Sequence, residues 1–317
     1  MYHYSSTILM KKIVTGMLLF ASTTVFGQIN SPWTQYYQVP YLQNPSLSGI
    51  ENDTDIKLGF KRQWTSFDGA PKNYFLGINH ALGERNAENI SDNKMPQRKM
   101  GISGYIAGSD YNGMSDLQTG VAYAVHIPVT EQYYLSFGIA TSYGRTRVSM
   151  DQYVRDKQDA MYLSLMKAGG TLSYFNLDAG ATLYADQFYV SYAAMHLVHS
   201  RVGDDLPGKN ESSIRHTVML GYRYTVNEDW ELQPGMLLRM EGGVKNLYAI
   251  NVKARYGTSL WGGIGVSVNE SLSLLAGYQV TDKLSISYSY DFNIGTLHTA
   301  SPGSHEFILG IRPFWNG

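Results

Sequence analysis

Residues 134–144 read Tyr-Leu-Ser-Phe-Gly-Ile-Ala-Thr-Ser-Tyr-Gly, and this stretch decides the fold. Odd positions from Leu135 to Tyr143 carry mostly large apolar side chains, whereas even positions from Ser136 to Gly144 carry Ser, Gly or Ala. Successive side chains of a β-strand point to opposite faces. The stretch therefore predicts a strand with one apolar face and one small or polar face.

The same alternation recurs along the chain and predicts about fourteen antiparallel strands. They are expected at residues 55–66, 73–82, 98–107, 118–128, 132–145, 172–184, 187–198, 214–225, 231–240, 246–256, 259–268, 271–281, 283–293 and 304–314.

Two architectures fit this alternation, a soluble sandwich and a membrane barrel. The barrel is favoured because the strands have the length of about ten residues that crosses a membrane. The second face is rich in Gly, Ser, Thr and Asn, and aromatic residues such as Tyr133, Tyr134 and Tyr143 gather at strand ends, as is typical of barrels in lipid. No long apolar run follows Phe26, so only a closed sheet pairs every backbone group in lipid. We predict an all-β fold, a transmembrane antiparallel β-barrel of the bacterial outer membrane.

The composition agrees with this fold class and excludes several functions. Among the 317 residues are 25 Tyr and 32 Gly, and only 16% are charged. The formal net charge of −1 argues against nucleic acid as a partner. The absence of Cys excludes disulfides and Cys-based metal sites.

The N-terminal residues resemble a secretory signal peptide. Lys11 and Lys12 precede a short apolar run, and small residues stand before a cleavage position after Gly27. The apolar run is too short to favour the alternative, a membrane anchor. We expect residues 1–27 to be a signal peptide, 28–54 a periplasmic N-terminal extension and 55–317 the barrel. The extension is expected to bind a partner or enter the lumen, with a disordered leader as the alternative.

The connections suggest how the barrel lies in the membrane. Short turns are expected on the periplasmic side and longer connections on the outer side, the usual pattern of outer-membrane barrels. The expected short turns are Thr130-Glu131, Ala185-Asp186, Asn227-Glu228, Gly257-Thr258 and Thr281-Asp282. The expected longer connections are 109–117, 146–171, 199–213 and 294–303, while 83–97 is a long segment on the periplasmic side.

Several short motifs, in this order and spacing, resemble those of the PorP/SprF family of type IX secretion system membrane proteins. The resemblance covers nearly the whole chain after residue 27. The motifs are Thr34-Gln35-Tyr36-Tyr37, Asn44-Pro45-Ser46-Leu47-Ser48-Gly49, Arg62-Gln63-Trp64, Asp68-Gly69-Ala70-Pro71-Lys72, Tyr192 to Leu197, Ser287-Tyr288-Ser289-Tyr290-Asp291 and Gly303-Ser304-His305-Glu306.

The resemblance implies a non-enzymatic outer-membrane component of the type IX secretion system. Such a protein would support export or surface anchoring of a secreted adhesin-like protein, in some cases for gliding motility at the cell surface. The implied partners are outer-membrane lipid, a secreted surface protein with a C-terminal sorting domain, and periplasmic peptidoglycan-binding and other type IX components. No cofactor is implied. The motif residues expected to have structural or partner roles are Asn44, Pro45, Gly49, Trp64, Gly69, Pro71, Gly303, Ser304, His305 and Glu306.

No residue pattern predicts a catalytic, cofactor or metal site. His305 and Glu306 are adjacent in a strand, and His196 and His199 are three apart, so each pair should diverge to opposite faces. Asp204, Asp205 and Glu211 have oxygen ligands suited to calcium, but a solvated loop is the better interpretation.

Two segments leave alternatives open. The turn at 68–71 needs no chemistry beyond its Gly and Pro, although it lies where it can touch a substrate. Residues 156–168 have helical spacing and are expected to form a plug, a docking surface or an ordinary loop.

Two other function classes are weighed against secretion. A porin or solute channel is the main alternative. A barrel enzyme would need clustered Ser, His and Asp residues at one rim, and the sequence suggests no such cluster.

Overall fold

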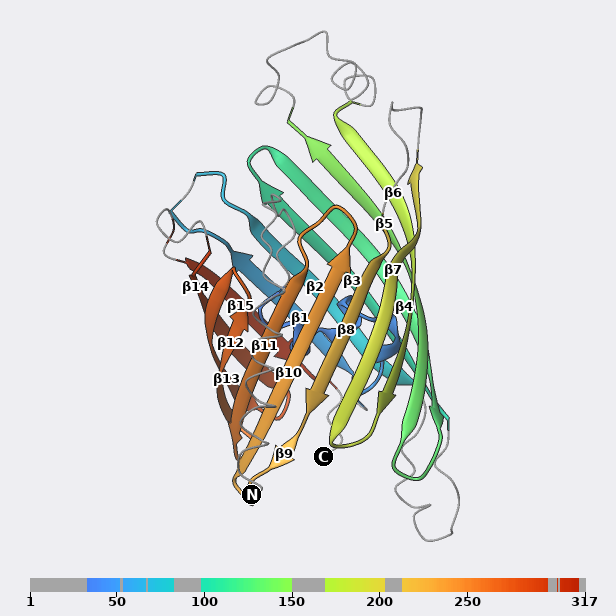
Figure 1. Cartoon of the computed structure of the whole chain (residues 1–317), viewed down its shortest axis with the longest axis vertical. Coiled ribbons are helices and arrows are strands. Elements are labelled where there is room, and N and C mark those ends of the chain that lie inside the picture. The colour runs from blue at the N-terminus through green and yellow to red at the C-terminus, as the bar shows by residue number, and fades with distance from the viewer. Residues whose placement is uncertain are drawn as a thin grey trace, which may run out of the picture.

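The computed structural model describes residues 33–51, 54–66, 68–82, 98–149, 169–202, 213–295, 301 and 303–313. Its strands form a single antiparallel sheet that closes on itself, because the last strand pairs with the first (Figure 1). The strands are β1 (Asp55–Arg62), β2 (Lys72–Leu82), β3 (Lys99–Tyr111), β4 (Met114–Pro128), β5 (Tyr134–Val148), β6 (Thr171–Tyr184), β7 (Phe188–Val202), β8 (Arg215–Tyr222), β9 (Tyr224–Thr225), β10 (Trp230–Glu241), β11 (Leu247–Tyr256), β12 (Leu260–Ser267), β13 (Ser271–Thr281), β14 (Leu284–Asn293) and β15 (Gly303–Ile311).

The described barrel has fourteen strands, as predicted. Strands β8 and β9 both pair with β10, on either side of Arg223, so they are two parts of one interrupted strand. Every other neighbour in the ring is a consecutive strand or the closing pair of β15 and β1. Closure removes the exposed sheet edges that lipid cannot hydrogen-bond.

The outer face of the barrel is apolar, as the alternation predicts. Along β5 the side chains of Phe137 and Ile139 point outward, and Ile139 is 60% exposed. Leu, Ile, Val, Phe and Tyr occupy equivalent outward positions on the other strands. Soluble monomers rarely expose a continuous apolar surface of this extent. Hydrocarbon is the environment that makes such a face favourable.

The inner face is polar and mostly buried. It carries Ser, Thr, Asn and charged side chains, including Ser136, Asn176 and Glu306, each fully buried. Aromatic rings lie across several strand glycines. The Tyr174 ring, for example, occupies the space where a Cβ on Gly144 would stand, an arrangement that covers weak glycine positions in a sheet.

One predicted connection is wrong. Residues 109–117 were expected to form a long outer connection, but β3 and β4 continue to a two-residue turn at Asn112-Gly113. Both turn residues have positive φ, 40° and 78°, as a type I′ hairpin turn requires. An Asn-Gly pair is the strongest short hairpin signal, and this signal outweighs the break in alternation around it.

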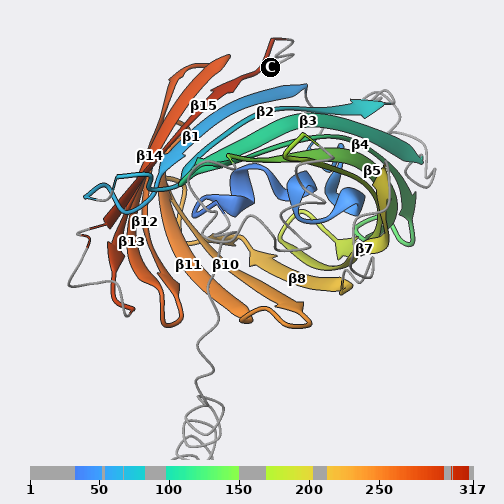
Figure 2. The ribbon, with the colours of Figure 1, turned by 90° about the horizontal axis from the view of Figure 1, so that it is seen from above.

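The N-terminal segment lies inside the barrel, where Figure 2 shows it crossing the lumen. It folds into three short 3-10 helices, η1 (Tyr36–Gln38), η2 (Pro40–Leu42) and η3 (Pro45–Leu47). Proline at the start of η2 and η3 fixes φ where no backbone donor is needed. We call residues 34–50 the luminal segment.

Four features expected from the sequence lie outside the described residues. They are the signal peptide at 1–27, the segment 83–97, the acidic loop with Asp204, Asp205 and Glu211, and the helical spacing at 156–168. Within the described ranges, no helix has the length and apolar character needed to cross a membrane.

Candidate functional site

The interface between the luminal segment and the barrel wall is the most elaborate polar site in the described residues. Hydrogen bonds join the segment to walls on different sides of the lumen. Their wall partners are Lys61 of β1, Asn79 of β2, Lys99 and Ser103 of β3, His126 of β4, Ser136 of β5, Thr182 of β6, Tyr192 of β7, Arg239 of β10, Asn251 of β11, Ser287 and Asp291 of β14 and Glu306 of β15.

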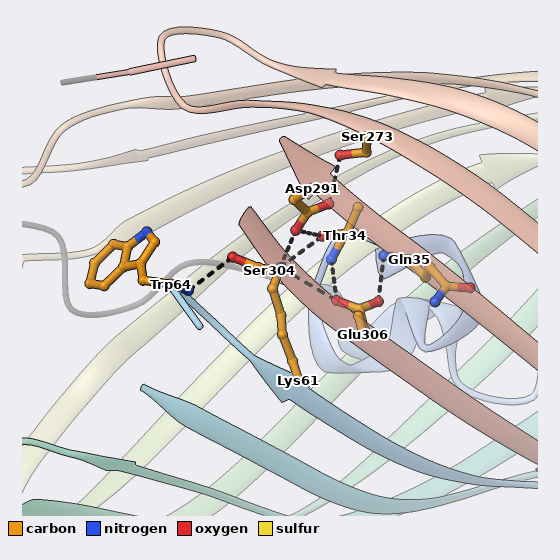
Figure 3. A network of polar contacts seen from close by, with 8 residues as sticks. All are labelled: Thr34, Gln35, Lys61, Trp64, Ser273, Asp291, Ser304 and Glu306. Atoms are coloured by element: carbon orange, nitrogen blue, oxygen red, sulfur yellow. Dashed lines mark hydrogen bonds and ion pairs between the residues drawn. The ribbon is translucent and has the colours of Figure 1, made fainter. Parts of the chain in front are cut away.

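Glu306 anchors the start of the segment (Figure 3). Its two carboxylate oxygens accept hydrogen bonds from consecutive backbone N–H groups, Thr34 at 2.8 Å and Gln35 at 2.9 Å. The Glu306 side chain is fully buried. Bonds from backbone N–H groups to an ionised acceptor are among the strong ones, so this carboxylate fixes where the chain enters the lumen.

Lys61 links the two acidic side chains of this network. Its Nζ lies 3.0 Å from Asp291 Oδ2 and 3.5 Å from Glu306 Oε2, and it donates to Thr34 Oγ1 at 2.7 Å. The Thr34 hydroxyl donates in turn to Asp291 Oδ2 at 2.7 Å, and Ser273 donates to the other Asp291 oxygen (Figure 3). One buried cation therefore serves two buried carboxylates, and N–H and O–H donors satisfy the remaining oxygens.

Glycines in the wall make room for the segment. A Cβ on Gly138 of β5 would collide with the backbone of Pro45 and Ser46, and one on Gly101 of β3 would collide with Ser48 O. A Cβ on Gly180 of β6 would likewise collide with the side-chain amide of Asn44. These strand glycines are required by the close approach of another backbone.

Apolar contacts add to the polar ones. Tyr36 and Leu47 pack with Met219, Leu237 and Leu247 on the β8, β10 and β11 side of the barrel. On the opposite side, a second cluster joins Val39 and Tyr41 to Phe75 and Ile308. Full burial stabilises each such side chain by about 1.5–3 kcal/mol. The segment is therefore held on both sides by packing as well as by hydrogen bonds.

Tyrosines of the segment stay neutral in this environment. Burial raises the pKa of Tyr36 and of Tyr41 above the usual value of a phenol. Asn251 donates a hydrogen bond of 2.7 Å to the Tyr36 hydroxyl. The ring of Tyr37 receives the Lys253 ammonium 3.7 Å from its centroid, a cation–π contact that stabilises further when water is excluded.

Asn44 organises the last turn of the segment, and its loss is expected to loosen η3. Its side-chain oxygen accepts from Ser46 N at 2.9 Å and from Ser46 Oγ at 2.7 Å, and its amide donates to Tyr192 O at 3.1 Å. Asn44→Ala leaves the buried Ser46 N–H without this partner, at a cost of about 1–3 kcal/mol. We expect faster proteolysis of residues 34–50 in the detergent-solubilised protein.

Asn227→Ala is the matched control for this substitution. Asn227 also accepts from two backbone N–H groups, those of Asp229 and Trp230, but its turn is exposed. Cleavage of the luminal segment should stay at the wild-type rate in this control. Equal rates for Asn44→Ala and wild type would contradict the role given to Asn44.

The structure places the residues singled out from the sequence in three groups. Asn44, Pro45 and Gly49 belong to the luminal segment; Trp64, Gly69 and Pro71 belong to the β1–β2 connection; Gly303, Ser304, His305 and Glu306 open β15. The second and third groups meet, because Ser304 Oγ accepts from Trp64 N at 3.4 Å and Gly303 O accepts from Thr65 N at 3.3 Å. Glu306 joins the third group to the first through Thr34 and Gln35.

His305 and Glu306 lie on opposite faces of β15. Glu306 points into the lumen, whereas His305 points outward. A hydrogen bond of 2.7 Å joins His305 Nδ1 to the Tyr288 hydroxyl. The expectation for His196 and His199 is wrong, since their ring centroids lie 5.9 Å apart. A bulge between β6 and β7 places His196 at φ 59° and breaks the alternation there. Among the described residues no group of three or more His, Asp and Glu side chains has metal-binding geometry.

Sequence reasoning missed Lys61 and the wall glycines. Lys61 follows Asp55 and Lys57 at alternate positions of β1, and charged residues recurring on one face of a strand signal a polar lumen. Gly101, Gly138 and Gly180 had no visible signal, because glycine also stands on the small face of other strands, for example at Gly59 of β1 and Gly77 of β2.

Comparison with known proteins agrees with this architecture. A family model described as "Type IX secretion system membrane protein PorP/SprF" matches residues 25–311. No curated protein matches the chain.

Solved structures with similar folds include the Acinetobacter baumannii outer membrane protein Omp33, at 12% identity over 84% of this chain and 100% of that chain, with a TM-score of 0.48. The CymD monoaromatic hydrocarbon channel is 9% identical over 90% of this chain and 93% of its own, with a TM-score of 0.44. The KdgM porin is 11% identical over 82% of this chain and 99% of its own, with a TM-score of 0.38. These similarities are too distant to bear on function.

Proposed function

The chain belongs to the PorP/SprF family of type IX secretion system membrane proteins, and from this premise we propose that it is a closed scaffold that holds or couples a secreted protein at the outer membrane. It is an outer-membrane component of that system. In the proposed role it makes and breaks no covalent bonds. It acts as a rigid barrel whose surface and loops contact the other parts of the export machine.

The observation that carries the proposal is the luminal segment. A solute channel needs a continuous path for water and solute, whereas this lumen contains a segment anchored on β1, β5, β10 and β15. Removing it would break the buried contacts of Glu306 and Lys61. This favours a scaffold over the alternative of a porin or solute channel.

The finer parts of the proposal come from the family. The protein to be exported or anchored is a surface adhesin with a C-terminal sorting domain, and in a motile cell the same role would serve gliding. The partners on the inner side are peptidoglycan-binding and other type IX components. Residues 1–27 would direct the chain to the periplasm and be removed there, which leaves the luminal segment near the new N-terminus.

A deletion strain of the native bacterium tests the proposal. We expect an adhesin-like protein with a sorting domain to be depleted from the surface proteome, while unrelated outer-membrane proteins keep their abundance. Reintroducing the wild-type gene should restore the adhesin. An unchanged surface proteome together with slower uptake of a small solute would support the channel alternative and overturn the proposal.

A further inference from the structure

Charged side chains on the outer face of the barrel are confined to one sector. Among the described strands, the residues on the lipid-facing side are apolar, small or neutral except at five positions near the same ends of β1, β2, β3 and β5. These five are Arg62, Lys72, Asp110, Arg145 and Arg147. Four are cations, so this sector has an excess of three positive charges.

The strand register aligns most of these side chains in one row. Arg62 is paired with Lys72, Lys72 with Asp110, Asp110 with Ser115, and Ser115 with Arg147. Residues directly opposite each other in a sheet share a face. The row therefore runs over five adjacent strands on the outward side of the barrel.

The row lines a cavity of about 390 Å³. The turn at 68–70 and the hairpin turn at Asn112-Gly113 cover it from the loop side and are joined by the bond from Asn112 N to Gly69 O, 2.9 Å. Arg62, Lys72 and Arg147 all contribute to its lining. The same lining includes two carboxylates, Asp68 and Asp110. The cavity is thus an open recess in which three cations outnumber two acidic side chains.

On β1, β2 and β4 the outward residues one step toward the middle of the barrel are apolar or aromatic. Phe60, Tyr74 and Leu117 stand next to Arg62, Lys72 and Ser115 on their strands, and they are 45%, 40% and 48% exposed. Aromatic residues at this level mark the boundary between hydrocarbon and headgroups. The described strands at this end lead into the connections 150–168 and 203–212, and long connections are typical of the extracellular side.

We propose that this recess binds the phosphate group of a lipid headgroup in the outer leaflet. The phosphate of such a lipid would place anionic oxygens beside Arg62, Lys72 and Arg147. The acyl chains of the same lipid would lie against the apolar outer face of the barrel. Arginine forks suit phosphate oxygens, and lysine adds a point charge. Asp110, opposite Lys72, and Asp68 in the turn both lower the positive potential of the recess and limit the affinity.

Native mass spectrometry of the detergent-solubilised full chain tests the site. The probes are diphosphoryl lipid A, the same glycolipid without phosphates, and inorganic phosphate. Wild type should retain the phosphorylated lipid and bind the other two at least about tenfold more weakly. Equal retention of the dephosphorylated lipid, or equal binding of inorganic phosphate, would overturn the proposal of a lipid phosphate site.

Charge variants locate the binding. Arg62→Gln, Lys72→Gln and Arg147→Gln combined should weaken retention of diphosphoryl lipid A by about tenfold or more, whereas Asp110→Asn should strengthen it. Lys283→Gln, in an exposed turn at the other end of the barrel, is the control and should bind as wild type. Each variant is first shown to run as a folded barrel on an unheated gel. An unchanged affinity in the triple variant, or an equal loss in the control, would overturn the assignment.

Discussion

Lys61→Met is expected to lower the free energy of unfolding by about 3–5 kcal/mol. Lys61 is the cation between Asp291 and Glu306, and its side chain is 3% exposed. Methionine keeps much of the side-chain length but leaves two buried carboxylates facing each other. Urea titration of the barrel in phospholipid vesicles, followed by tryptophan fluorescence, measures the change.

A second substitution separates charge from packing at this position. Asp291→Asn in the Lys61→Met background removes one of the two uncompensated charges, so it should recover part of the lost stability. Lys283→Met, in an exposed turn, should change the unfolding free energy by less than about 0.5 kcal/mol. A Lys61→Met protein that unfolds at the wild-type urea concentration would refute the electrostatic account of the anchor.

Gly138→Ala is expected to displace the luminal segment and open a conducting path. The added Cβ would collide with the backbone of Pro45 and Ser46, which cannot rotate away as a side chain can. Overpacking of this kind costs about 1–3 kcal/mol, and movement of the segment relieves it. In planar bilayers we expect steady openings from the variant where the wild type gives none.

Gly104→Ala is the matched control for this experiment. Gly104 lies in β3, and a Cβ there would meet its nearest atom, Gly120 O, at an ordinary 3.7 Å. The control should therefore conduct as the wild type does. If Gly138→Ala gave the same current record as Gly104→Ala, the close approach at Gly138 would not control the position of the segment.

The barrel itself was predictable from the sequence for a simple physical reason. Alternation with period two is a local property, and a strand such as β5 shows it over its whole length. Because the chain has no long apolar run for a spanning helix, a closed sheet is then the one way to pair every backbone N–H and C=O group in lipid. The strand count is correct, and the main error, at 109–117, arose where an Asn-Gly turn interrupts two otherwise continuous strands.

The interior of the barrel was not predictable in the same way. The luminal segment has no periodicity, because it consists of three single 3-10 turns. Its position depends on contacts such as that between Thr34 and Glu306, which are 272 positions apart. Thr34, Gln35, Asp291 and Glu306 belong to the family motifs. Only the fold shows that they form one network with Lys61.

The anchor network has a consequence for assembly of the barrel. Glu306 of the last strand and Lys61 of the first face each other across the closing seam of the sheet. The luminal segment binds both, so its placement and closure of the barrel stabilise the same pair of strands. The Thr34 hydroxyl, in contact with Lys61 and Asp291, completes the network only when all three elements are in place.

A disulfide cross-link tests most directly the claim that residues 34–50 occupy the lumen in the membrane. Ser46 Oγ and Thr182 Oγ1 lie 2.6 Å apart, and the chain has no cysteine of its own. Ser46→Cys with Thr182→Cys should form a bond in isolated outer membranes under mild oxidation, seen by mass spectrometry as one linked peptide pair. Ser46→Cys with Tyr143→Cys, whose second site faces lipid, should not. Free thiols in the first pair, open to a membrane-impermeant reagent, would contradict the occupied lumen.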